Sequence, residues 1–82
     1  SSQHDRELAA RLASLSPQQF RVLTLVAEGL LNKQIADRLD VQERTVKAHL
    51  TAIFDRMGVR NRTQAGVVLR ELELSDPARQ IE

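Results

Sequence analysis

The chain has 82 residues, of which 41% are hydrophobic and 28% are charged, and its formal net charge is +1. This length allows one small domain, and its core must be mainly aliphatic because Phe20 and Phe54 are the only aromatic residues. The chain contains no cysteine, which excludes disulfides and thiolate metal sites, and no apolar run approaches the roughly 20 residues that a bilayer-spanning helix needs.

A short amphipathic helix is predicted over residues 4–14, because Leu8, Leu12 and Leu15 recur at helical spacing. The chain starts with Ser1 and not with methionine. We therefore expect it to be a piece of a longer protein, in which this first helix ends the linker from a preceding domain.

The second predicted helix begins at a strong start signal. Ser16 is a good N-cap, Pro17 suits the first helical position, and Gln19 completes an S-x-x-Q capping box. Gly29 is expected to end this helix in a left-handed conformation. The predicted buried face consists of Val22, Leu23, Val26 and Ala27.

Two further helices follow, separated by a tight turn. Asn32 is expected to cap a very short helix over residues 33–39, and residues 40–42 form the turn. The next helix is predicted over residues 43–57 and closed by Gly58.

The last predicted helix begins after Asn61, an N-cap that forms an N-x-x-Q box with Gln64, and runs to about Leu72. No alternating strand pattern occurs in the sequence. The predicted fold class is therefore all-α, a four-helix helix-turn-helix bundle with an additional short N-terminal linker helix. The predicted divisions are a linker over residues 1–14, a domain over residues 15–74 and a flexible tail over residues 75–82.

The helix over residues 43–57 has two separate faces. One has the spacing of a core stripe and consists of Val46, Leu50, Ile53, Phe54 and Met57. The other is polar and consists of Arg44, Lys47, Ala48, Thr51 and Asp55. Lys47 can donate to guanine, Thr51 can bond a base edge and Ala48 can touch a thymine methyl group, as in a helix that reads the major groove. A solvated polar surface is the alternative interpretation of this face.

Basic residues are concentrated around this helix. Residues 32–63 contain seven basic residues against four acidic ones, whereas the rest of the chain contains five against seven. A positive patch on an otherwise acidic body favours binding to phosphate groups.

Several motifs at fixed distances together resemble the LuxR-type (GerE-like) helix-turn-helix domain, over roughly residues 15–72. They are Leu15-Ser16-Pro17, Val22-Leu23, Ala27-Glu28-Gly29-Leu30, Asn32-Lys33-Gln34-Ile35-Ala36, Thr45-Val46-Lys47-x-His49-Leu50, Ile53-Phe54-x-Arg56-Met57-Gly58-Val59 and Asn61-Arg62-Thr63-Gln64-Ala65. The resemblance implies a bacterial transcription regulator, in which this domain follows either a phosphorylatable receiver or a small-molecule-sensing domain. We expect the first of these, so that the chain is the C-terminal effector domain of a response regulator.

The resemblance also implies roles for individual residues. Lys47, Ala48 and Thr51 fall at positions that face bases. Phosphate contacts are expected from Lys33, Thr45, Arg62 and Thr63, and we add Arg44 from the basic end of the polar face. The implied partners are double-stranded DNA, bound as an inverted repeat, and a second copy of the chain, with RNA polymerase as a further candidate. The dimer contact is expected on the last helix, at Gln64, Val67, Arg70, Glu71 and Leu74.

The sequence departs from the family pattern at the start of the groove-reading helix. Gln42 stands where a serine cap is usual. Because glutamine is a poor N-cap, the helix is expected to be about 0.5–1 kcal/mol less stable than it would be with serine at this position. Gln18 and Gln19 replace a common Arg-Glu pair, and Ala52 stands where asparagine is frequent.

Other functions have less support. The carboxylates are scattered and His49 has no nearby catalytic partner in the sequence, so we predict no enzyme, no cofactor, no metal and no small-molecule ligand. A sigma-factor region with the same motif and a protein-interaction bundle without DNA binding are the alternatives. We expect a bacterial cytoplasmic protein with no membrane contact.

Overall fold

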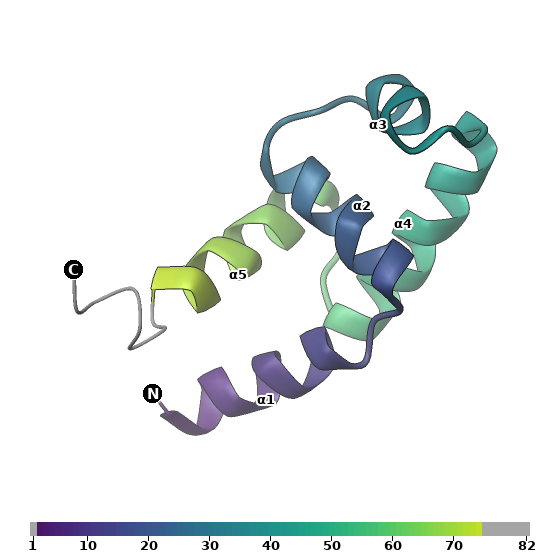
Figure 1. The fold of residues 1–82 in the computed structure, drawn as a ribbon. Coiled ribbons are helices and arrows are strands. Elements are labelled where there is room, and N and C mark those ends of the chain that lie inside the picture. Colours follow the sequence, from purple (N-terminus) through teal and green to yellow (C-terminus); the bar gives the residue numbers. More distant parts are fainter. Residues whose placement is uncertain (1, 75–82) are drawn as a thin grey trace.

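The computed structural model describes residues 2–74, which form five helices and no strand (Figure 1). The helices are α1 (Ser2–Ala13), α2 (Pro17–Ala27), α3 (Asn32–Leu39), α4 (Glu43–Met57) and α5 (Arg62–Leu74). The all-α prediction is confirmed. The predicted tail over residues 75–82 lies outside the described residues. The first helix begins at Ser2 instead of residue 4, and the last one continues two residues beyond Leu72.

The predicted capping boxes are formed, one completely and one in part. At α2 the Gln19 N–H donates to Ser16 Oγ at 3.1 Å, and the Ser16 N–H donates to Gln19 Oε1 at 3.0 Å. At α5 the Gln64 N–H donates to Asn61 Oδ1 at 2.9 Å. Gln64 Oε1, however, accepts from the N–H of Arg60 at 2.7 Å and not from the cap residue itself.

The predicted cap of α3 is wrong by one residue. Leu31 occupies the N-cap position, and Asn32 is the first residue of the helix. Leu31 has no side chain that can accept from the helix amides, and its own N–H donates to Gln34 Oε1 at 2.7 Å. The side-chain oxygen of Asn32 instead accepts from Arg62 at 2.6 Å, which explains why it does not serve as the cap.

Three helices end in the same way. The chain turns at a residue with positive φ after α2, α3 and α4: Gly29 (94°), Asp40 (57°) and Gly58 (69°). The residue after each turn donates its N–H five positions back, from Leu30 to Leu25 (3.1 Å), from Val41 to Ala36 (3.0 Å) and from Val59 to Phe54 (3.0 Å). This is the Schellman motif, which satisfies carbonyl groups at a helix end. The three donating residues are apolar, and each packs against the core.

The core is aliphatic, as the composition predicts. Its fully enclosed side chains come from four helices and are Val22, Leu23, Ile35, Val46, Ile53 and Ala65. Helix α2 lies in the centre, packed against α5, α4 and α3 (Figure 1). Helix α1 packs against α4 and α5, with Leu8 buried and Leu12 against the core. Its role as a linker stays a prediction.

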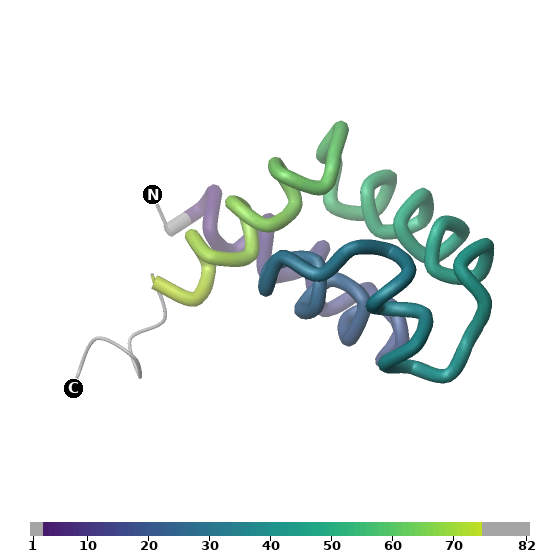
Figure 2. Tube along the Cα trace, turned by 90° about the horizontal axis from the view of Figure 1, so that it is seen from above, coloured from purple at the N-terminus to yellow at the C-terminus, as the bar shows by residue number. Residues whose placement is uncertain are grey.

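The molecule is elongated, and different helices lie at its two ends. Helix α3 and the first turns of α4 lie at one end, and the start of α1 and the end of α5 lie at the other (Figures 1 and 2). The principal extents of 37 × 27 × 20 Å describe this elongated form.

Gly66 provides a test of the packing between α5 and α2. It lies inside α5, and a Cβ atom added there would meet only the Cα atom of Ala27, at the ordinary contact distance of 3.7 Å. Because alanine has a higher helix propensity than glycine, Gly66→Ala should raise the free energy of unfolding by about 0.5–1 kcal/mol. Denaturant unfolding followed by circular dichroism measures this change. A lower stability would show that α2 and α5 tolerate no added methyl group.

Candidate nucleic-acid interface

Helices α3 and α4 form a helix-turn-helix at one end of the bundle (Figure 2). The left-handed Asp40 makes the turn, and the half-buried Leu39 and Val41 on either side of it anchor the turn in the core. Ile35 and Ala36 are the buried residues of α3. Helix α3 is thereby fixed on the rest of the domain, and α4 follows it after the turn.

The start of α4 carries the poor cap that the sequence predicts. Gln42 forms no side-chain hydrogen bond to the helix, and its carbonyl oxygen accepts from the amides of Thr45 (3.0 Å) and Val46 (3.3 Å). No described residue accepts from the amides of Glu43 and Arg44. These donors, at the positive end of the helix dipole, are available to an anion such as a phosphate group.

The two predicted faces of α4 are separate in the structure. The inner face is buried at Val46, Leu50, Ile53 and Met57, and Phe54 is half-buried against the same core. The outer face is exposed at Arg44, Lys47, Ala48, Thr51 and Asp55. Within the described part of the chain, the side chains of Arg44 and Lys47 form no hydrogen bond or ion pair. The Thr51 hydroxyl donates to the Lys47 carbonyl oxygen at 3.1 Å, which leaves its oxygen as an acceptor.

The residues assigned to phosphate contacts have different environments. Lys33 is exposed in the first turn of α3, Thr45 is half-buried in the first turn of α4, and Thr63 is exposed in the first turn of α5. Arg62 differs from all of them. Its guanidinium group is part-buried and donates to Asn32 Oδ1 and to the Leu30 carbonyl oxygen, both at 2.6 Å.

The outward side of α5 carries the residues assigned to a dimer contact. Val67 is 51% exposed and Leu74 is 66% exposed. The polar members of the set, Gln64, Arg70 and Glu71, are also exposed. The structure thus presents all five on the surface, and their role stays a prediction.

Two arginine contacts were not predicted from the sequence. The first is the link from Arg62 to Leu30 and Asn32. In the second, Arg56 of α4 donates to the Ser14 carbonyl oxygen at 2.8 Å and holds the end of α1. Both contacts join residues at least 30 positions apart, and no spacing within one helix indicates them.

Other kinds of site receive no support from the described residues. Among residues 2–74, no group of three His, Cys, Asp or Glu residues is placed to hold a metal ion, and no helix has both the length and the apolar character needed to cross a membrane. His49 is half-buried on α4.

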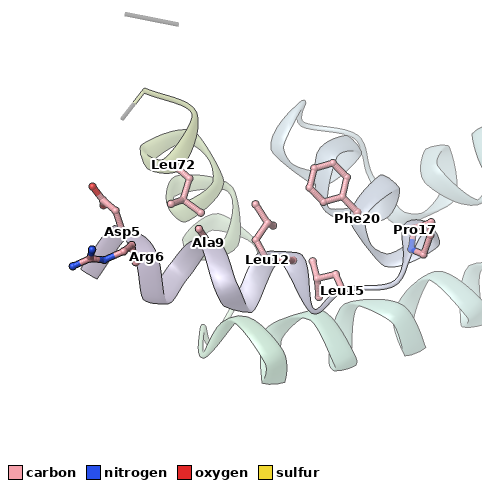
Figure 3. Close-up of a pocket in the computed structure, with 9 residues that line it drawn as sticks. Asp5, Arg6, Ala9, Leu12, Leu15, Pro17, Phe20 and Leu72 are labelled. Carbon is pink, nitrogen blue, oxygen red and sulfur yellow. The ribbon is translucent and has the colours of Figure 1, made fainter. Parts of the chain in front are cut away.

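An open apolar groove of about 610 Å³ lies between α1, the start of α2 and α5, lined chiefly by Leu12, Leu15, Phe20 and Leu72 (Figure 3).

The chain is similar to known proteins in both sequence and structure. The profile of the family described as bacterial regulatory proteins, luxR family (GerE), matches residues 13–69. The DNA-binding transcriptional activator DevR/DosR of Mycobacterium tuberculosis is 44% identical over 66 residues, which are 80% of this chain and 30% of that protein. The nitrate/nitrite response regulator NarL of Escherichia coli is 43% identical over 53 residues, 65% of this chain and 24% of that protein.

A solved structure is similar as well. The response regulator StyR superposes with a TM-score of 0.81 at 31% sequence identity, over 85% of this chain and 35% of that one. The chain therefore spans about a third or less of the proteins that it resembles.

Proposed function

Because the chain belongs to the luxR family of bacterial regulatory proteins, whose members are DNA-binding transcription regulators and not enzymes, we propose that α4 enters the major groove of double-stranded DNA. Lys47 donates to O6 or N7 of a guanine, Ala48 contacts a thymine methyl group, and Thr51 bonds a neighbouring base edge. The observation that carries this proposal is the exposed outer face of α4, on which the Lys47 ammonium group has no partner among the described residues.

Phosphate groups are bound on either side of this helix in the proposed complex. Lys33 and Arg44 supply positive charge, and Thr45 and Thr63 supply hydroxyl donors. The unpaired amides at the start of α4 add a donor pair on the helix axis. Such contacts fix the position of the protein on DNA without reading the sequence.

The proposed assembly is a dimer on an inverted repeat. The exposed Val67 and Leu74 form an apolar stripe on α5 that a second copy would cover. Two α4 helices related by a twofold axis then reach half-sites about one helical turn apart. Since relatives such as NarL are named response regulators, we assign the chain to the output part of such a protein, with RNA polymerase as a candidate contact on DNA.

Two alternative functions have less support than DNA reading. The luxR family match sets aside a sigma-factor region. An interaction bundle without DNA binding has in its favour only the uncapped Gln42 and the low net charge. Those two features are compatible with DNA binding, since a phosphate group can cap the helix and the basic residues are locally concentrated.

Selection from a library of random duplexes, followed by titration at two salt concentrations, tests the proposal. We expect one sequence motif to be enriched. With Lys33 and Arg44 near phosphates, the logarithm of affinity should fall against the logarithm of salt concentration with a slope of about −1.8 per protomer, or about 12-fold between 50 and 200 mM salt. No enrichment, or an affinity independent of salt, would contradict DNA reading and favour the interaction bundle.

A further inference from the structure

Arg62 has an environment unlike that of the other basic residues near the helix-turn-helix. It is the first residue of α5, and its guanidinium group reaches 30 positions back along the chain. One nitrogen donates to Asn32 Oδ1 and the other to the Leu30 carbonyl oxygen, each at 2.6 Å. Arg62, Asn32 and Leu30 are all half-buried. These are short hydrogen bonds, which the charge on the donor strengthens.

The two acceptors lie on either side of the connection between α2 and α3. Leu30 belongs to the Schellman motif that ends α2, and Asn32 begins α3. The planar guanidinium group therefore spans the connection and bonds both of its sides. Lysine could not reproduce this arrangement, because its ammonium group is a point donor on a flexible stem.

Helix α3 needs such support at its start. It has only eight residues, and its N-cap residue Leu31 offers no side-chain acceptor. Helices this short are marginal in water without tertiary contacts. The Ile35 amide, which bonds the Leu31 carbonyl oxygen at 2.9 Å, closes the first turn directly beside the Arg62 contact.

We infer that Arg62 is a positioning residue for the helix-turn-helix, acting through Asn32 and Leu30, and not a phosphate contact. A guanidinium group that turned toward DNA would leave two half-buried acceptors without their partner, which costs more than a surface contact returns. Arg62 thereby ties the start of α5 to the start of α3 and sets the place of Lys33 in the next position of α3. This inference rests on the proposed function for its effect on DNA.

The first experiment needs no DNA and measures amide hydrogen exchange in the free chain. Arg62→Gln and Arg62→Lys should both speed exchange of the Ile35 amide by about tenfold, relative to amides in α1. The matched control is Arg60→Gln, which removes an exposed charge two residues away whose side chain has no bond among the described residues. It should leave the Ile35 amide unchanged. Unchanged exchange in both Arg62 variants would overturn the inference.

The second experiment is a double-mutant cycle on the selected duplex. If Arg62 acts through Asn32, then Asn32→Ala and Arg62→Gln should each weaken DNA binding about tenfold. The double variant should then bind within about twofold of either single variant, because both substitutions remove the same interaction. A direct phosphate contact predicts instead that the two losses multiply and that Arg62→Lys restores most of the affinity. That result would overturn the inference.

The two arms also separate this inference from the proposed function. If the unmodified chain does not bind the selected duplex, the proposed function fails, and the exchange measurement alone decides the role of Arg62. If the chain binds and the cycle is additive, only the inference fails. The variant Arg62→Lys serves as the second variant should Arg62→Gln lose its fold.

Discussion

Replacing Lys47 by alanine is expected to lower the affinity for the selected duplex by a factor of about 5 to 150, equivalent to about 1–3 kcal/mol. The Lys47 side chain is exposed, forms no hydrogen bond within the described residues and lies on the outer face of α4. Its removal therefore leaves the fold intact and subtracts only what it gives to DNA. The preference at one base pair should relax at the same time.

Binding titrations on selected and random duplexes measure this effect. Arg21→Ala is the matched control, because it removes the same charge from an exposed position on α2, outside the helix-turn-helix. We expect it to change affinity little. If Lys47→Ala bound the selected duplex as the unmodified chain does, the groove assignment would be wrong. An equal loss on both duplexes would make Lys47 a phosphate contact.

Introducing a charge on α5 is expected to have the largest effect of all, on assembly. Val67 is 51% exposed, so Val67→Glu should leave the monomer folded. Across the proposed twofold contact, however, the new glutamate of one protomer would face that of the other, and the two negative charges would repel each other. Affinity for a duplex with both half-sites should fall by about 100-fold or more, because linked binding of two protomers contributes a factor of that order. Affinity for a single half-site should stay unchanged.

Ala10→Glu is the control for the added charge, since Ala10 is exposed on α1. Sedimentation of the protein–DNA complexes measures how many protomers bind. Val67→Glu binding the two-site duplex as tightly as the unmodified chain would remove α5 from the dimer contact. An equal loss on the half-site would show that the substitution damages DNA reading and not assembly.

Local signals in the sequence predicted the helix-turn-helix closely. The bounds of α4 agree with the structure at Glu43 and Met57, because Gly58 and the spacing of the core stripe both act within a few residues. The same holds for the capping box of Ser16 and Gln19 at α2. These interactions are encoded by residue types at fixed short spacing, so one sequence suffices to find them.

The interactions that were missed are tertiary. Asn32 has the residue type of an N-cap, but its oxygen accepts from Arg62, 30 positions further along the chain, and the cap position is occupied by Leu31. The family resemblance placed Arg62 at a phosphate contact, and nothing in its spacing indicated the amide oxygen and the backbone carbonyl oxygen that it bonds within the domain. Such pairings depend on how the helices pack, which spacing along one chain does not contain.

The positions of the start of α1 and the end of α5 have a practical consequence. The start of α1 and the end of α5 lie on the side of the molecule away from α3 and the first turns of α4 (Figures 1 and 2). A fluorophore or an affinity handle attached beside the start of α1 or the end of α5 would therefore lie away from the first turns of α4. Tethered to a sensor surface at one of these two positions, the domain would present the first turns of α4 to duplexes in solution.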